Sequence, residues 1–184
     1  LIIKYEYKSN KKTHVNLTNH SYWNLEKIKK NKIYNHELKL NSNKYLQIDK
    51  DLIPTGKTNR VKNSIYDFLK FQNLGKKLNF FKNKKIDLKH KGFDITYIVK
   101  KNSRNFVGSL KNKNSNIQVD FFSNLPGVQL YSAQNLNYKK KLFPYQGICL
   151  ETQYFPDTPN KKNFPSTLIK ANKRYTCFTK IKIY

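Results

Sequence analysis

Hydrophobic and polar residues alternate along most of this chain, and the wider spacing of an amphipathic helix is rare. Runs of β-branched and aromatic residues recur at short intervals, separated by Asn, Lys, Pro and Gly. This pattern is typical of strands joined by turns. The predicted strands cover residues 1–7, 15–25, 36–40, 45–48, 93–100, 105–110, 117–123, 127–132, 147–152, 166–170 and 174–183.

Two segments interrupt the alternation. Residues 64–78 have hydrophobic positions with loose helical spacing, which predicts a helical turn or two. Residues 51–56, DLIPTG, are predicted to be a loop because Pro54 fixes φ and Gly56 permits a tight turn. Many short strands with turns between them predict an all-β fold, a sandwich or barrel. The 184 residues suit a single domain, 1–184, with a sizeable core.

The composition is strongly basic without indicating a specific nucleic-acid partner. The chain has 37 basic and 11 acidic residues, a net charge of +26. Almost all the basic residues are Lys, dispersed among Asn, and Arg occurs only at Arg60, Arg104 and Arg174. Arg is the residue that makes bidentate contacts to phosphates and bases. We therefore expect only non-specific attraction to polyanions.

The number of cysteines and the hydropathy bear on the cellular location and on the kinds of site that the chain could form. Cys149 and Cys177 are too few for a disulfide framework, and neither lies in a zinc-ligand spacing, so no metal site is predicted. A reducing, cytoplasmic location is the expectation. No apolar run reaches membrane-spanning length, and no membrane partner is expected. The chain lacks Met and opens on a strand-like run, which suggests a fragment.

Carboxylates are scarce, and two of them lie in apolar, strand-like segments. They are Asp94 in GFDITYIV and Glu151 in GICLETQYF. A charge there is costly unless it is paired or used. On a strand, Glu151 shares one face with Cys149 and Gln153, while aliphatic neighbours point to the other face. Glu151 is therefore a candidate base with a shifted pKa.

One histidine lies in a stretch that is poor in charge. His20 is in VNLTNHSYWNL, residues 15–25. It is either a packed histidine on a strand or a group that does chemistry, and Glu151 could equally pair with a Lys. From the residues alone, a site shared by His20, Asp94 and Glu151 remains one of these alternatives. His14, His36 and His90 have charged or loop-like neighbours and are expected at the surface.

Five segments together resemble the aldose 1-epimerases, the galactose mutarotases, and they occur in that family's order. The segments are VNLTNHSYWNL at 15–25, DLIPTGKTNRV at 51–61, GFDITYIV at 92–99, LPGVQLYSAQNL at 125–136 and GICLETQYFPDTPNKKNFPSTLIK at 147–170.

The resemblance implies an isomerase that interconverts the α and β anomers of aldohexoses such as galactose and glucose, without cofactor or metal. It assigns Glu151 as the base and His20 as the acid. Asp94, Gln129 and Tyr22 are then expected to contact the sugar. In that scheme Glu151 takes the proton of the C1 hydroxyl and His20 protonates the ring oxygen, from opposite sides of the reacting atoms.

The family is roughly twice as long as this chain. Its N-terminal half carries an Asn-Arg pair and another His that bind the sugar, and nothing here matches them. The resemblance therefore implies the incomplete C-terminal portion of a large antiparallel β-sandwich. Two alternatives remain: a catalytically inactive carbohydrate-binding relative, and a basic polyanion-binding protein.

Overall fold

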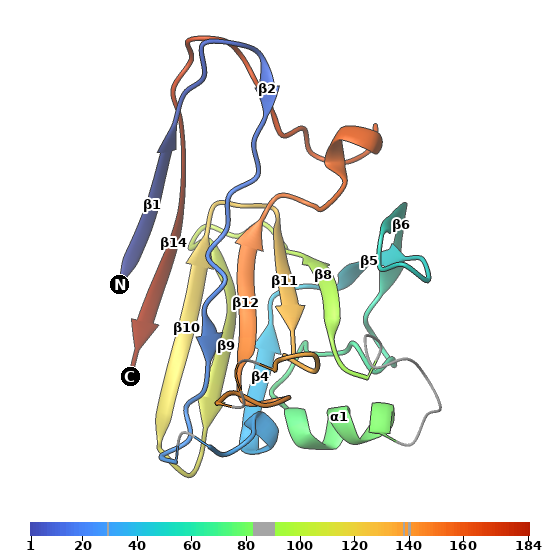
Figure 1. The fold of residues 1–184 in the computed structure, drawn as a ribbon, viewed down its shortest axis with the longest axis vertical. Helices are drawn as coiled ribbons and strands as arrows, with labels where there is room; N and C mark the ends of the chain where they lie inside the picture. Colours follow the sequence, from blue (N-terminus) through green and yellow to red (C-terminus); the bar gives the residue numbers. More distant parts are fainter. Residues whose placement is uncertain (29, 83–90, 138, 140) are drawn as a thin grey trace.

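The computed structural model describes residues 1–28, 30–82, 91–137, 139 and 141–184. Within this part the fold is all-β, as predicted, and consists of two six-stranded sheets and a two-stranded pair (Figure 1). The neighbouring strands pair antiparallel throughout the sheets, as in β11 with β12 and β10 with β14. The alternation in the sequence is therefore the alternation of two sheet faces.

The first sheet has the order β1-β14-β10-β9-β4-β7. Its strands are β1 (Ile2–Tyr7), β14 (Tyr175–Ile183), β10 (Ile117–Ser123), β9 (Phe106–Asn112), β4 (His36–Leu40) and β7 (Gln72–Asn73). The second sheet has the order β3-β12-β11-β8-β5-β6. Its strands are β3 (Tyr22–Trp23), β12 (Ile148–Gln153), β11 (Gly127–Tyr131), β8 (Asp94–Ile98), β5 (Lys44–Ile48) and β6 (Pro54–Arg60). The pair is β13 (Leu168–Ile169) with β2 (Thr13–His14).

The strand predictions agree with the structure, with ends moved by a few residues, except at 15–25 and 166–170. In the first of these segments only β3 is a strand, and in the second only β13. Side-chain hydrogen bonds replace strand pairing in the first segment. Asn16 donates to the Tyr154 carbonyl at 3.1 Å and accepts from its N–H at 2.9 Å, and Thr18 donates to the Thr152 carbonyl at 3.1 Å. Such side chains offer the backbone an alternative to the sheet.

The helical elements also differ from the prediction. In the part of the chain that the structure describes, the α-helix α1 covers Leu74–Lys82, so it begins near the end of the segment expected to be helical. Short 3₁₀ helices lie at Ile33–Asn35 and Thr158–Asn160 in the same part. The loop predicted at 51–56 is wrong in its second half, because β6 already begins at Pro54 and pairs with β5.

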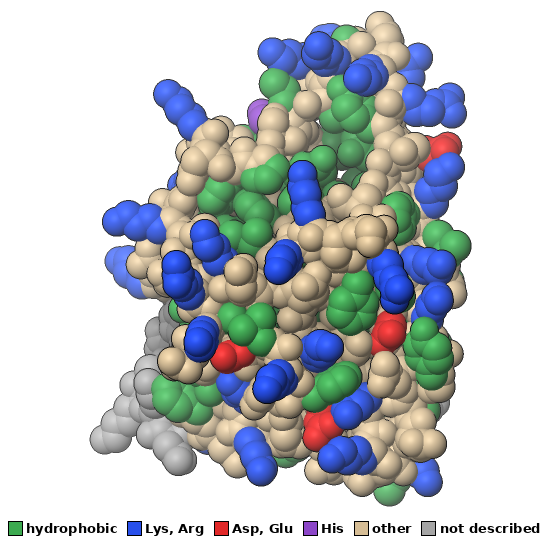
Figure 2. Space-filling model, turned by 180° about the vertical axis from the view of Figure 1, so that it is seen from behind, with side chains coloured by type: hydrophobic (Ala, Val, Ile, Leu, Met, Phe, Trp, Pro, Cys, Tyr) green, Lys and Arg blue, Asp and Glu red, His purple; other side chains and the backbone are tan. Residues whose placement is uncertain are grey.

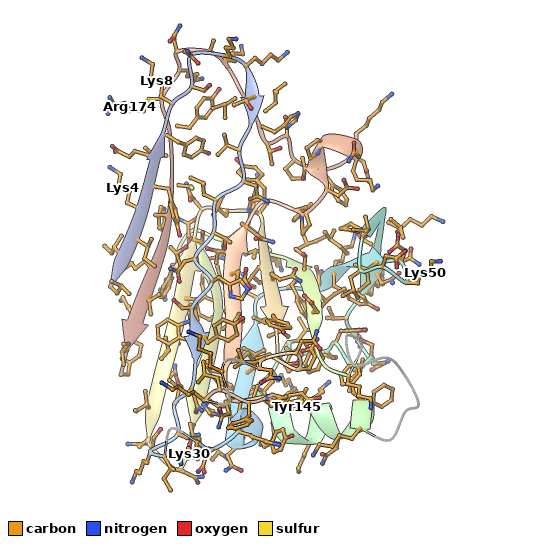
Figure 3. All side chains as sticks on the ribbon, viewed as in Figure 1. Lys4, Lys8, Lys30, Lys50, Tyr145 and Arg174 are labelled. Atoms are coloured by element: carbon orange, nitrogen blue, oxygen red, sulfur yellow. The ribbon has the colours of Figure 1, made fainter. Side chains whose placement is uncertain are left out.

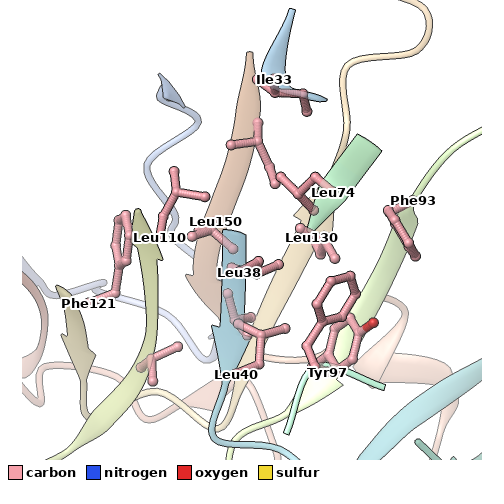
Figure 4. Packing of buried hydrophobic residues seen from close by; sticks show 14 of the residues in the cluster. Ile33, Leu38, Leu40, Leu74, Phe93, Tyr97, Leu110, Phe121, Leu130 and Leu150 are labelled. Carbon is pink, nitrogen blue, oxygen red and sulfur yellow. The ribbon is translucent and has the colours of Figure 1, made fainter. Parts of the chain in front are cut away.

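The core fills the space between the two sheets. Figure 4 shows Leu38, Leu40, Leu110 and Phe121 from the first sheet meeting Tyr97, Leu130 and Leu150 from the second, and all of them are buried. Phe93 and Leu74, at the start of α1, extend this cluster towards the helix. In β8, β11 and β12, successive side chains point to opposite faces. The residues between the core-facing ones therefore lie on the other face of the second sheet.

The basic side chains are dispersed over the surface. On the face shown in Figure 2, Lys and Arg cover many separate positions, with few acidic residues among them. Figure 3 places Lys4, Lys8 and Arg174 along the β1–β14 ribbon, with Lys30 and Lys50 at distant edges. In the described residues, no helix has the length and apolar character needed to cross a membrane.

We predict that truncating the core at Leu110 destabilises the chain. Leu110 of β9 is fully buried, so Leu110→Ala should lower the free energy of unfolding by about 2–5 kcal/mol. Denaturant-induced unfolding measures this loss. Leu142→Ala, at an exposed position, is the control and should change stability by less than about 0.5 kcal/mol. Equal losses in the two variants would contradict the position of the core.

Candidate active site

The strand register of the second sheet places polar side chains in a row on the face away from the core. Gln129 of β11 lies opposite Thr96 of β8 on one side and opposite Glu151 of β12 on the other. Directly opposed residues in an antiparallel pair share a face. Their sequence neighbours, such as Leu130 and Leu150, point into the core. Thr96, Gln129 and Glu151 are far apart in the sequence, but the strand register makes their side chains neighbours.

A second row runs beside the first. Tyr131 lies opposite Asp94 on β8 and opposite Cys149 on β12, and Cys149 lies opposite Tyr22 on β3. Residues of both rows line a cavity of about 470 Å³. It is lined by His20, Tyr22, Asp94, Gln129, Tyr131, Glu151, Gln153 and Pro156.

The cavity brings together all five residues proposed from the sequence: His20, Tyr22, Asp94, Gln129 and Glu151. Three further lining residues were not proposed: Tyr131, Gln153 and Pro156. The period of two along the strands is the signal that identifies the first two of these, because Tyr131 follows Gln129 and Gln153 follows Glu151 on the same face.

His20 and Glu151 are in direct contact. Nε2 of His20 lies 3.2 Å from Oε1 of Glu151. The Glu151 side chain is only 8% exposed, whereas that of His20 is 51% exposed. The two groups lie side by side, and their expected placement on opposite sides of the reacting atoms stays a prediction. Adjacent groups suit a sugar, since its C1 hydroxyl and its ring oxygen are bonded to the same carbon.

The imidazole of His20 is held on several sides. Its Nδ1 lies 3.6 Å from Sγ of Cys149. The ring of Tyr22 lies 5.0 Å away between centroids, and the ring of Tyr131 meets it edge-on at 6.2 Å. Tyr22 remains 46% exposed, so it offers an aromatic surface to the cavity. Aromatic faces of this kind suit the apolar C–H side of a sugar ring.

Gln129 orients Asp94. Its side-chain amide donates from Nε2 to Oδ1 of Asp94 at 2.6 Å, while its Oε1 accepts a hydrogen bond from the Thr96 hydroxyl. These two bonds leave one amide orientation for Gln129. Both Asp94 and Gln129 are then fixed before a ligand binds.

The two carboxyl groups are harder to ionise than usual. Burial raises the pKa of Glu151, and the nearby Asp94 raises it further, although His20 acts in the opposite direction. Burial also raises the pKa of Asp94, against the hydrogen bond from Gln129 and the charge of His20. A carboxyl group of raised pKa is a better proton acceptor when it is ionised, which suits general-base catalysis.

The cavity lining has no basic side chain other than His20. No Lys or Arg lines it within the described residues, although the chain has 37 of them. The site is therefore a locally acidic and neutral-polar region in a strongly basic molecule. A phosphorylated ligand would find no cation among these side chains, whereas a neutral polyhydroxyl ligand would find acceptors and donors.

The other histidines differ among themselves. The prediction that His36 is on the surface is wrong: it is fully buried, and its Nε2 accepts a hydrogen bond from the Leu25 N–H at 2.7 Å. Burial lowers the pKa of His36 to about 4, so it is neutral at physiological pH. The alternation of HELKL, which puts His36 on the face of Leu38 and Leu40, was the missed signal. His14 is exposed, as predicted, and His90 lies outside the described residues.

Sequence comparison agrees with this geometry. The family model for aldose 1-epimerase matches residues 1–182. The chain belongs to the aldose 1-epimerase family. The galactose mutarotase of Mus musculus is 33% identical over 189 residues, which cover 99% of this chain and 53% of the relative. The aldose 1-epimerase of Haemophilus influenzae is 30% identical over 188 residues, 98% of this chain and 54% of the relative.

Solved structures of aldose epimerases share the fold. The aldose epimerase homologue from C. elegans superposes with a TM-score of 0.86 at 20% identity, covering 100% of this chain and 55% of that one. The galactose 1-epimerase from Lactobacillus acidophilus gives a TM-score of 0.82 at 22% identity, covering 100% and 52%. This aldose 1-epimerase family member therefore spans about half the length of the relatives that it matches, and its fold is that of galactose mutarotase-like proteins.

We predict that Glu151→Gln makes the chain more stable at pH 7. The pKa of Glu151 is raised in the folded chain, so ionising it favours the unfolded chain as the pH rises above its unfolded pKa of about 4.3. A neutral Gln avoids this loss, and the half-exposed His20 can be solvated without its partner. The gain should shrink as the pH falls towards about 4, measured by urea unfolding.

Glu37→Gln is the matched control, with the opposite sign. Against the cost of burial, hydrogen bonds from Lys111 and Lys113 lower the pKa of Glu37. Its ionised form therefore stabilises the folded chain at pH 7, and Gln should remove that contribution. A Glu151→Gln variant that is less stable than the parent at pH 7 would show that the contact with His20 outweighs the burial of the carboxylate.

Proposed function

We propose that this chain carries the acid–base centre of an aldose 1-epimerase that interconverts the α and β anomers of neutral aldohexoses such as galactose and glucose. The observation that carries the proposal is the contact at 3.2 Å between the imidazole of His20 and the buried carboxylate of Glu151. Membership of the family and the relatives named galactose mutarotase support it.

The reaction needs two coupled proton transfers. Glu151 accepts the proton of the C1 hydroxyl, and protonated His20 donates its proton to the ring oxygen. The bond between C1 and the ring oxygen breaks as the C1 carbonyl forms, which gives the open-chain aldehyde. The aldehyde rotates about the C1–C2 bond, and the ring closes on the other face of the carbonyl. As the ring closes, His20 recovers a proton from the hydroxyl that had formed from the ring oxygen, and Glu151 returns its proton to O1.

The remaining residues of the cavity hold the sugar. Asp94 and Gln129, fixed by their mutual hydrogen bond, accept from and donate to sugar hydroxyls. Tyr22 provides an aromatic surface beside His20. Because the lining has no Lys or Arg within the described residues, the substrate is a free sugar in preference to a sugar phosphate.

The proposal extends to the setting of the protein. The scheme asks the protein only to accept and donate protons, so it requires no cofactor and no metal. Residues 1–184 act as the C-terminal portion of a longer epimerase domain. The two cysteines are unpaired, which supports a cytoplasmic location.

Polarimetry tests the proposal. α-Galactose or α-glucose is dissolved in buffer with the purified chain, and the approach to anomeric equilibrium is followed. The chain should accelerate this approach over buffer alone. Glu151→Gln and His20→Asn should each lower the rate about 10²- to 10⁴-fold, because each removes one positioned proton transfer.

Glu37→Gln is the control for the loss of one carboxylate, because Glu37 lies on β4 in the other sheet and pairs with Lys111. It should retain the parent's rate. A folded parent that is no faster than Glu151→Gln would contradict the proposal. If such a chain still bound galactose, the inactive carbohydrate-binding alternative would hold. If it bound only polyanions, in a salt-dependent manner, the third alternative would hold.

The pH dependence of kcat/KM gives a further prediction. Glu151 must be ionised to act as base, so activity falls on the acid side as it becomes protonated. Asp94 is one of the groups that raise the pKa of Glu151. Asp94→Asn should therefore move the acid limb of the profile to lower pH, whatever its effect on the rate itself. An acid limb that stays in place or moves to higher pH would contradict this coupling.

A further inference from the structure

We propose that His20, Cys149 and Glu151 form a binding site for a divalent cation of the Zn²⁺ type, and that the bound cation blocks the acid–base pair. Metal-ligating atoms of these three side chains all lie within 4.8 Å of one another. The cation is an inhibitor of the site and takes no part in the reaction proposed above. The cation site is independent of that reaction, whereas the inhibition rests on the proposed function.

The three ligands come from two adjacent elements. Cys149 and Glu151 are two residues apart on β12 and point to the same face, and His20 comes from the segment that leads into β3. Strand β3 pairs with β12 through Cys149 and Tyr22, which holds this segment beside the two ligands. The pairing of β3 with β12 therefore holds all three ligands close together.

The distances fit a tetrahedral site. A zinc ion with a Zn–S bond of about 2.3 Å and a Zn–N bond of about 2.0–2.1 Å separates the two ligand atoms by about 3.6 Å. The Sγ of Cys149 lies 3.6 Å from Nδ1 of His20. The Glu151 carboxylate contacts the other ring nitrogen at 3.2 Å, and its ligand oxygen lies within 4.8 Å of the ligand atoms of the other two side chains.

Two of the three ligands, His20 and Glu151, line the cavity, which gives a bound ion access to it. Three protein ligands with one open position are the usual arrangement of an accessible zinc site. The open position would hold a water molecule or a sugar hydroxyl. A thiol, an imidazole and a carboxylate are ligands that suit Zn²⁺ and Co²⁺ better than the hard cations Mg²⁺ and Ca²⁺.

The local charge favours a cation in spite of the net charge of +26. Glu151 and Asp94 are both near the site, and no Lys or Arg lines the cavity within the described residues. A thiol binds a metal as its thiolate, so binding releases the thiol proton to solvent as the sulfur–metal bond forms.

Inhibition follows from the identity of the ligands. A cation bound to a nitrogen of His20 and an oxygen of Glu151 occupies the lone pairs that accept protons. The base and the acid are then removed together. Ions such as Mg²⁺ should have little effect, because they prefer oxygen ligands and retain their water.

Cobalt is the probe that tests the site directly. Co²⁺ bound to a thiolate gives a near-ultraviolet charge-transfer absorption, which requires no enzymatic activity. The untagged chain should develop this absorption on titration with Co²⁺, and Zn²⁺ should displace it. Cys149→Ser should lose the absorption and weaken Zn²⁺ binding about tenfold or more.

Cys177→Ser is the matched control, because Cys177 is also a buried free thiol but lies on β14 in the other sheet. It should retain the absorption. Since a change at buried Cys149 could impair folding, His20→Asn provides a second variant at a half-exposed position. It should weaken Co²⁺ and Zn²⁺ binding by about tenfold or more, with the fold checked by circular dichroism.

The outcomes separate the two proposals. No thiolate absorption in the parent, an absorption lost in Cys177→Ser but retained in Cys149→Ser, or binding unchanged in folded His20→Asn would each overturn the cation site. An absorption that depends on Cys149 in a chain without mutarotase activity would support the cation site and contradict the proposed function. In an active chain, Zn²⁺ should slow mutarotation at the concentrations at which it displaces Co²⁺, and Cys149→Ser should need about tenfold more.

Discussion

The antiparallel register of β8, β11 and β12 is the constraint on which the rest of the site depends. It places Thr96, Gln129 and Glu151 in one row on the face away from the core. A slip of one residue in β12 would turn Glu151 into the core and bring Leu150 to the cavity. The packing of Leu130 and Leu150 between the sheets opposes such a slip, so the burial of the core also fixes the positions of the catalytic candidates.

The position that the register gives Glu151 disfavours its ionised form, which is the form that would act as the base. Glu151 is almost completely buried and lies near a second carboxyl group, Asp94, and both conditions favour its neutral form. His20 offsets this through direct contact while remaining half exposed. A base of raised pKa beside an accessible acid is a common arrangement for moving protons near neutral pH. The free energy of unfolding is thus lower with ionised Glu151 than it would be with a neutral side chain at this position.

The sequence predicts most of the strands and names five residues that the structure brings to one cavity, but it does not predict all of the local structure. Alternation identifies β8 to β12 because each strand buries one face, and the resemblance of five motifs identifies His20 and Glu151. The segment 15–25 was predicted as a strand because its side chains suit one, yet Asn16 and Thr18 bond to the backbone of 152–154 instead. His36 was placed at the surface by its charged neighbour, although strand geometry puts it in the core. Contacts between distant segments decide both cases, and local patterns do not contain them.

We expect His20 and Glu151, in the positions set by the sheet register, to transfer protons to and from a sugar. Exchange NMR of galactose labelled with ¹³C at C1 tests this transfer, because it measures anomer interconversion at equilibrium. Exchange peaks between the α and β signals should grow with the concentration of the folded chain and vanish with Glu151→Gln. Exchange at the buffer rate in the presence of the folded parent chain would contradict it.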